Sequence, residues 1–171
     1  MRRLAPVSLL AALALSCAVA RAAPPKVLPI TASGLKKEVA RLKGKVVVIN
    51  FWATWCPPCV AEFPDLVSTQ KKLASKGVEL LTVSLDDTDD LKKAVVPFLA
   101  KNGVAKGAFI NKDGQSPDMG FFTWLEGKTP SSLGIPRTYI LNRQGKVVAR
   151  LVGGQDGAAF EAAVKKALAG K

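Results

Sequence analysis

The sequence predicts an α/β fold in which a central mixed sheet carries helices on both faces. Residues 45–52 form a near-continuous apolar run, as is typical of a strand covered on both sides, and 78–85 is predicted as the next buried strand. The segment 142–145 (Asn-Arg-Gln-Gly) separates two further apolar runs and indicates a hairpin turn. The order strand, helix, strand, helix, hairpin, helix implies parallel pairing through the crossovers and antiparallel pairing in the hairpin.

The first 22 residues have the pattern of a secretory signal peptide. Met1-Arg2-Arg3 is a basic start, Leu4 to Ala20 is an apolar run, and Ala20-Arg21-Ala22 is an Ala-x-Ala cleavage signal. A retained membrane anchor and a lipoprotein with Cys17 as its lipidated N-terminus are the alternatives. We therefore expect a signal peptide over 1–22 and a single folded domain over 23–171.

The first elements of this domain follow from proline, glycine and apolar spacing. The segment 27–30 contains a proline and is predicted as an edge strand, because proline cannot donate to a central ladder. Ser33 is the expected cap of a short helix that ends at Leu42. A longer helix is expected over 57–75, with Pro64 inside it.

The later elements are less regular. The acidic run 86–90 does not fit a calcium loop and is expected to cap a helix over 90–101. Residues 106–132 carry no pattern that indicates a function, although 106–110 is expected to be extended. The last predicted helix spans 156–168. An aromatic cluster is expected to pack as core near the cysteine motif described next; its members are Phe121, Phe122, Trp124 and Leu125.

The segment Trp55-Cys56-Pro57-Pro58-Cys59 lies between a predicted strand and a predicted helix. Two cysteines with this spacing at a helix N-terminus are arranged for thiol–disulfide chemistry, because the helix dipole favours a thiolate. A zinc site needs further ligands, but the chain has no histidine and only Cys17 besides the pair. A c-type haem site needs histidine where Val60 stands. We therefore expect no metal and no cofactor.

The charge balance bears on partners. The chain has 25 Lys and Arg against 13 Asp and Glu, and loss of Arg2, Arg3 and Arg21 with the signal would leave a net charge of +9. The lysines are spread along the sequence without interleaved aromatics, so we expect no nucleic-acid partner. Weak association with an anionic membrane surface is compatible with this charge.

Residues 46–64 (VVVINFWATWCPPCVAEFP) resemble the active-site block of the thioredoxin superfamily, and more narrowly of exported TlpA/ResA-like thiol–disulfide oxidoreductases. The likeness continues through Gly134-Ile135-Pro136 and through 142–147, and is weakest over 106–132. The resemblance implies a thioredoxin fold for 23–171 and a redox-active disulfide between the paired cysteines.

The family's roles fall on individual residues. Cys56 matches the attacking thiol and Cys59 the resolving thiol. Trp55 matches the aromatic that shields the pair, and Ile135-Pro136 the cis-proline loop that binds the substrate backbone. Glu62 matches an acid that assists proton transfer, and the alternative for it is an ordinary exposed helix residue.

Two positions depart from the wider pattern. Asn50 stands where thioredoxin has a buried aspartate, so proton transfer must fall to Glu62 or water. Arg137 stands where the family often has threonine. We expect its charge to lie beside the disulfide and to stabilise a thiolate there.

The resemblance implies an enzyme that reduces disulfides in exported proteins, including apocytochrome c during cytochrome c maturation, on the periplasmic or extracytoplasmic side of a bacterial membrane. A membrane-bound thiol electron donor would reset it. A disulfide-forming oxidase is the first alternative. A thiol peroxidase is disfavoured, since Ile49 and Ala53 stand where proline and threonine are expected.

Overall fold

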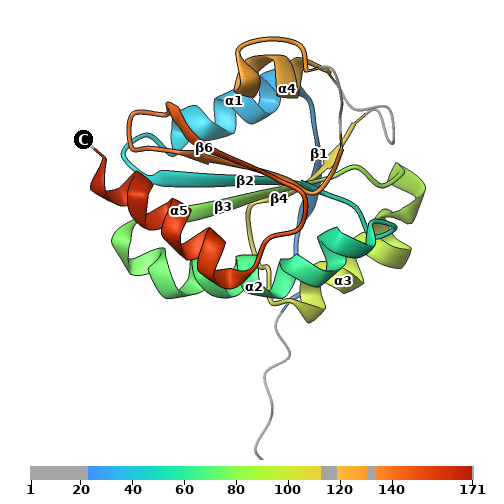
Figure 1. Cartoon of the computed structure of the whole chain (residues 1–171). Coiled ribbons are helices and arrows are strands. Elements are labelled where there is room, and N and C mark those ends of the chain that lie inside the picture. Colours follow the sequence, from blue (N-terminus) through green and yellow to red (C-terminus); the bar gives the residue numbers. More distant parts are fainter. Residues whose placement is uncertain (1–22, 113–118, 131–133, 171) are drawn as a thin grey trace, which may run out of the picture.

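The computed structural model describes residues 23–112, 119–130 and 134–170. Within these ranges the strands form one sheet in the order β1-β4-β3-β2-β5-β6 (Figure 1). The pairs β1–β4, β4–β3 and β3–β2 are parallel, and β2–β5 and β5–β6 are antiparallel, so the predicted mixed sheet is confirmed. The strands are β1 (Val27–Ile30), β2 (Val46–Trp52), β3 (Val78–Ser84), β4 (Ala108–Asn111), β5 (Arg137–Leu141) and β6 (Val147–Val152).

Helices cover both faces of this sheet (Figure 1). One face carries α1 and α4, and the other carries α2, α3 and α5. The helices are α1 (Ala32–Arg41), α2 (Pro57–Leu73), α3 (Val96–Lys101), α4 (Met119–Glu126) and α5 (Gly157–Ala169). Shorter turns are η1 (Ala74–Lys76) and η2 (Thr88–Asp90), both 3₁₀, and η3 (Leu91–Val95), a π-helical turn.

The central strand β2 joins two cores. All of its residues are buried, and successive side chains point to opposite faces. Val46, Val48 and Trp52 enter the core under α2 and α5, whereas Ile49 and Phe51 enter the core under α1 and α4. Since side chains alternate with a period of two, Asn50, the one polar residue of the strand, lies on the α2 side. The site described below is on that side.

The aromatic cluster predicted near the cysteine motif is helical, but its position differs from the prediction. Phe121 and Phe122 are fully buried and contact Phe51 at ring-centroid distances of 5.5 and 4.7 Å. They therefore lie across the sheet from α2. The aromatics on the α2 side of the sheet include Trp52 and Phe63, whose centroids are 4.7 Å apart.

Two predicted helix starts are wrong. Thr31, not Ser33, caps α1, because its Oγ1 accepts the Gly34 N–H at 3.3 Å. The acidic run does not cap α3: neither Asp87 nor Asp90 makes a side-chain cap bond at the turns that precede it. The segment instead passes from 3₁₀ to π to α geometry.

The signal peptide predicted for 1–22, with Cys17, lies outside the described residues, as do 113–118 and 131–133 of the region with no assigned function. Among the helices that are described, none is both long and apolar enough to cross a membrane.

Candidate active site

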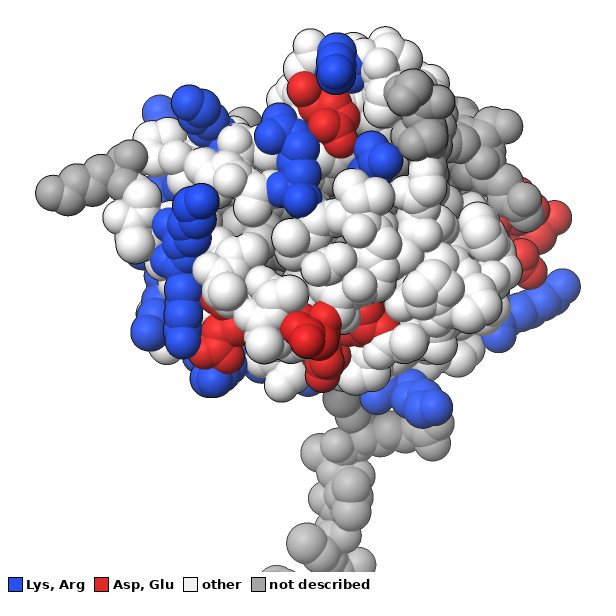
Figure 2. All heavy atoms as spheres, in the orientation of Figure 1, with Lys and Arg blue, Asp and Glu red and all other residues white. Residues whose placement is uncertain are grey.

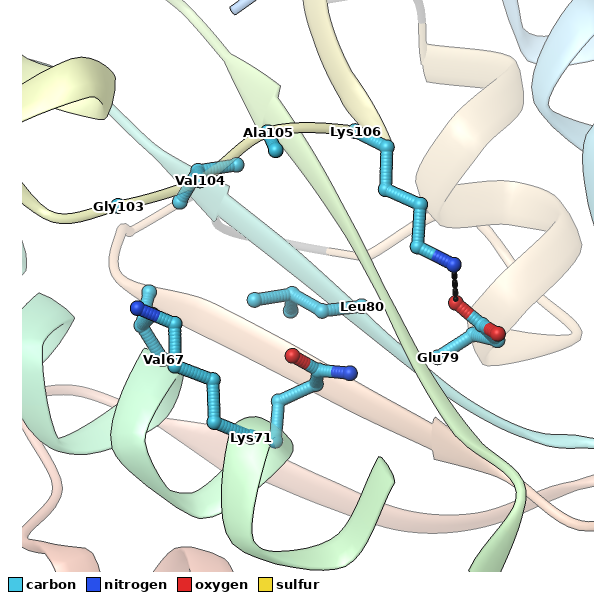
Figure 3. Close-up of a pocket in the computed structure, with 9 residues that line it drawn as sticks. Val67, Lys71, Glu79, Leu80, Gly103, Val104, Ala105 and Lys106 are labelled. Carbon is cyan, nitrogen blue, oxygen red and sulfur yellow. Dashed lines mark ion pairs between the residues drawn. The ribbon is translucent and has the colours of Figure 1, made fainter. Parts of the chain in front are cut away.

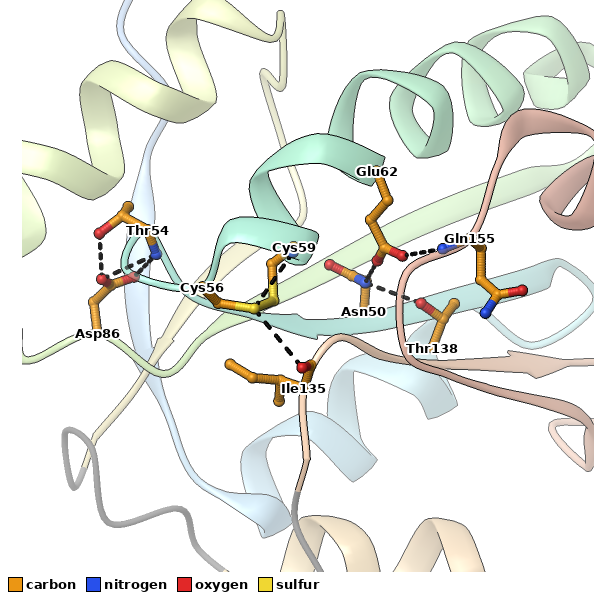
Figure 4. The surroundings of a disulfide bond; sticks show 9 residues. All are labelled: Asn50, Thr54, Cys56, Cys59, Glu62, Asp86, Ile135, Thr138 and Gln155. Carbon is orange, nitrogen blue, oxygen red and sulfur yellow. Dashed lines mark hydrogen bonds between the residues drawn. A yellow bond between two sulfur atoms is a disulfide. The ribbon is translucent and has the colours of Figure 1, made fainter.

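The paired cysteines lie where β2 passes into α2 (Figure 4). Cys56 occupies the N-cap position with extended backbone, and its Sγ accepts the Cys59 N–H at 3.3 Å. Pro57 and Pro58 fill the first helical positions, where a missing N–H leaves no bond unmade. Cys56 and Cys59 form a disulfide, with an S–S distance of 2.08 Å. The helix N-terminus therefore directs its partial positive charge at Cys56 Sγ.

The two sulfurs differ in access. Cys56 retains 5% of its surface, whereas Cys59 is completely buried. Cys56 Sγ lies 3.8 Å from the carbonyl oxygen of Ile135, and the Ile135–Pro136 peptide bond is cis. Of the two sulfurs, only Cys56 therefore has surface that an incoming thiol or disulfide could meet; the attacking and resolving roles stay predictions.

An uncharged rim surrounds Cys56. Trp55, the residue before Cys56, is 53% exposed. Gly153 donates its N–H to the carbonyl of Pro136 at 2.9 Å, and a side chain at Gly154 would contact Pro58 Cβ at 3.6 Å. The start of α2, the cis-proline loop and the loop after β6 thus meet at one edge of the disulfide.

Glu62 is a buried acid, so the alternative of an ordinary exposed residue is wrong. It is 4% exposed and lies one helical turn after Cys59. Its Oε1 accepts from Asn50 Nδ2 at 3.1 Å, and its Oε2 accepts from the Gln155 backbone N–H at 2.9 Å (Figure 4). Burial raises the pKa of Glu62 from 4.5 to about 7, although both hydrogen bonds oppose the shift. Such a group can accept or release a proton near neutral pH.

Glu62 also has a path to solvent. It lines a cavity of about 260 Å³ between α2 and the loop that leads into α5, together with Ala61 and Asp65. This opening lies on the side of Glu62 that faces Gln155. Protons can therefore exchange there without passing Trp55.

Sequence reasoning missed most of the groups that hold Glu62. Asn50 was identified only as a departure from thioredoxin, and its Nδ2 also donates to Thr138 Oγ1 at 2.9 Å. Thr138 lies on β5, which pairs with β2 in the register Asn50↔Thr138. Gln155 contributes its backbone alone, and no local sequence pattern marks such a contact.

A second buried acid, Asp86, fixes the turn before the cysteines. Its carboxylate accepts from Thr54 N at 3.1 and 3.0 Å, from Thr54 Oγ1 at 2.5 Å and from Ser84 Oγ at 2.6 Å (Figure 4). Asp86 therefore holds residues 53–55 against the end of β3. This contact occupies the Asp86 carboxylate, so this member of the acidic run serves the turn before the cysteines and not a helix cap.

The prediction for Arg137 is wrong. Its Nη1 donates to Glu126 Oε1 at 3.1 Å, and its guanidinium lies 5.9 Å from the centroid of Phe122. Both partners belong to α4, on the sheet face opposite α2. The positive charge is therefore paired with a carboxylate and directed away from the disulfide.

The described residues contain no cluster of three or more metal-ligating side chains. Another hollow, of about 140 Å³, lies between α2, β3 and residues 103–106 (Figure 3). Its floor is apolar, with Val67 and Leu80, and its Lys106 forms an ion pair with Glu79 at 2.9 Å. It has no residue in common with the cysteine site.

The sequence is similar to those of known thiol-disulfide oxidoreductases. The sequence profile of the Redoxin family matches residues 18–168. The chain is 37% identical over 121 residues to the thiol-disulfide oxidoreductase ResA of Bacillus subtilis strain 168, a match that covers 71% of this chain and 60% of that protein. The ResA protein of Bacillus thuringiensis strain Al Hakam is 35% identical over 133 residues, with coverages of 78% and 69%. The chain thus spans about three fifths of the length of the first relative.

Solved structures give the same result for the fold. A thiol:disulfide interchange protein of the thioredoxin family from Chlorobium tepidum TLS superposes with a TM-score of 0.63 at 28% identity, covering 86% of this chain and 98% of that one. A putative thiol:disulfide interchange protein DsbE from Chlorobium tepidum gives 0.60 at 31% identity, covering 85% and 94%. The predicted fold class is confirmed by both.

Proposed function

This chain belongs to the Redoxin family and to its ResA-like thiol–disulfide oxidoreductases, and from that premise we propose that it reduces disulfide bonds in exported proteins. The observation that carries the proposal is the asymmetry of the cysteine pair. Cys56, at the N-cap of α2, keeps 5% of its surface exposed, whereas Cys59 is completely buried. One thiol can meet a substrate, and the other can act only on the first.

The reaction begins with both cysteines reduced. The Cys56 thiolate attacks one sulfur of the substrate disulfide, which forms a mixed disulfide and releases the other substrate sulfur as a thiolate. The Cys59 thiolate then attacks Cys56 Sγ, forms the internal disulfide and releases the second substrate sulfur. Two electrons pass from the enzyme dithiol to the substrate, and each released thiolate takes up one proton.

Glu62 is placed to manage the proton of Cys59. Cys59 is buried among apolar side chains, and burial of this kind disfavours the thiolate that it must form. A carboxylate one turn away with a pKa of about 7 can accept that proton when Cys59 attacks. It can then return the proton to solvent through the cavity beside Gln155. Glu62 is therefore assigned the role of general base in the second step.

The proposal also includes a cellular compartment, an electron donor and a substrate. The basic start, apolar run and Ala-x-Ala signal of residues 1–22 support export, where disulfides form and where a dedicated reductant has substrates. A thiol donor in the membrane would supply two electrons to regenerate the dithiol. Apocytochrome c, whose haem-binding cysteines must be reduced, is a substrate of the expected chemistry.

The reduction potential of the Cys56–Cys59 pair tests whether the protein reduces or forms disulfides in its substrates. After equilibration with dithiothreitol buffers, we expect a reduction potential of about −270 mV, the value for thioredoxin. A value near about −120 mV would identify a disulfide-forming oxidase and overturn the proposal. The C56S variant should lose insulin reduction. The C59S variant should accumulate mixed disulfides with its substrates, and their identification from periplasmic extract would test the partners.

A further inference from the structure

A second concave site lies at the end of the sheet opposite the disulfide. It is a pocket of about 390 Å³ between α1, α4 and the turn that joins β5 to β6. Lys45 immediately precedes β2 and lines the pocket, whereas Cys56 follows the other end of that strand. The seven residues of β2 place the two sites roughly 20 Å apart at about 3.3 Å per residue. A molecule in the pocket would not compete with a substrate at Cys56.

The floor of this pocket is apolar. Val39 and Val47 are buried, with 7% and 1% of their surfaces exposed, and Trp124 is half-buried at the wall. The volume falls in the range of small-molecule sites, roughly 300–1,000 Å³. An indole face beside aliphatic side chains is suited to a flat apolar ring.

The rim is positively charged. Lys36, Lys43 and Lys45 line the pocket and are exposed, and no acidic residue lines it. Among the described residues, none of these three lysines forms an ion pair, and Lys36 Nζ lies 5.6 Å from the centroid of Trp124. The hollow of Figure 3 differs, because Glu79 neutralises its Lys106.

A fourth cation strengthens this field. The Arg143 guanidinium donates to the carbonyls of Gly44 and Lys76, both at 3.0 Å, so it is held beside Lys45. The two carbonyls satisfy the guanidinium's hydrogen-bond donors but carry no net charge, so the positive charge of Arg143 remains. Figure 2 shows one face of the molecule, on which basic side chains are frequent at the left, with acidic ones below them. The three lysines and Arg143 concentrate positive charge near the pocket, and such a concentration attracts an anion.

We propose that this pocket binds a small organic anion with a flat apolar ring. The ring lies against Trp124 and the valine floor, and its carboxylate or sulfonate meets Lys43 and Lys45. An aromatic anion also suits Lys36, whose ammonium already lies over the indole. The proposal is independent of the cysteine chemistry, since it uses none of the residues around Cys56.

Titration of the ¹⁵N-labelled chain with 2-naphthoate, followed by NMR, tests the proposal. We expect saturable shifts for α1, for 142–145 and for the Trp124 indole N–H, with little change over 53–59. The double variant K43S/K45S should weaken binding about tenfold, because it removes two charges near the carboxylate. The spectra themselves report whether each variant is folded.

The matched control is K92S/K93S, which removes the same charge from η3. It should change the affinity by no more than about twofold. Equal weakening in both double variants would show attraction to net charge alone and overturn the proposal. Equal binding of neutral 2-naphthamide, shifts centred on Trp55, or no saturation up to about 10 mM would also overturn it.

Discussion

Two buried carboxylates flank the disulfide, and they are built differently. Asp86 accepts from the backbone and hydroxyl of Thr54 and from the hydroxyl of Ser84, all within 3.1 Å. Glu62 accepts one hydrogen bond on each oxygen, from Asn50 and from Gln155, and borders a cavity. Both side chains are almost fully buried.

The difference shows that burial alone does not define a catalytic acid. Donors surround the Asp86 carboxylate, so this side chain is fixed in place and organises the turn. Glu62 has fewer donors and a route to water, and its pKa of about 7 permits proton transfer. We therefore assign Asp86 to the architecture of the site and Glu62 to its chemistry.

The largest effect is expected for D86A on stability. Removal of the carboxylate leaves the Thr54 N–H and the Ser84 hydroxyl without their acceptor, which should cost about 4 kcal/mol of unfolding free energy. Urea denaturation measures the loss. D89A, at an exposed position of the same acidic run, is the control and should change little. A loss of equal size in both variants would contradict the anchoring role.

The next effect is on the pH dependence of stability. The pKa of Glu62 is raised on folding, so its contribution is complete below about pH 4.5 and is lost as the pH rises to about 7. The loss should approach about 2–3 kcal/mol across this window. In the E62Q variant, the unfolding free energy should no longer fall over this pH range. Urea denaturation at several pH values measures it for both proteins. If the unfolding free energies of the wild-type and E62Q proteins changed with pH in parallel, the raised pKa of Glu62 would be disproved.

A free-energy effect of similar size is expected on catalysis. E62Q should slow release of substrate from the mixed disulfide by about 100-fold, since the general base of the second step is lost. Attack by Cys56 should change much less. Rapid-quench analysis separates the two steps, and E38Q on α1 provides a control. If E62Q slowed only the first step, the assignment to Cys59 would be wrong.

The smallest effects concern the partners of Glu62. N50A removes a hydrogen bond that favours the charged form, so the pKa of Glu62 should rise above about 7. Q155A should leave the pKa unchanged, because Gln155 donates through its backbone. Carboxyl ¹³C NMR titration measures both values. A shift in Q155A as large as that in N50A would refute this division of roles.

The sequence predicts the strands and the cysteine pair well because their signals are local. The run 46–52 is apolar except for Asn50, and Cys56 and Cys59 lie one turn apart at the start of the helix that follows. The hairpin and the C-terminal helix are likewise marked by a Gly-containing turn and by the Asp156 cap.

The rest of the site depends on contacts between distant segments. Thr138 reaches Asn50 only through the β2–β5 register, and Gln155 reaches Glu62 from a loop that follows β6. Arg137 was expected beside the disulfide because it follows Pro136 in sequence. Its position in β5 instead directs its side chain to the face that carries Glu126. Strand alternation, which one residue reverses, decided that outcome.

The loop after β6 has a thermodynamic consequence. Gly153 donates to the Pro136 carbonyl, and two residues later the backbone of Gln155 donates to Glu62. A protein that docks at Pro136 and displaces this loop therefore alters the affinity of Glu62 for its proton. Linkage requires the reverse by the same factor, so docking strength must vary with pH wherever Glu62 titrates.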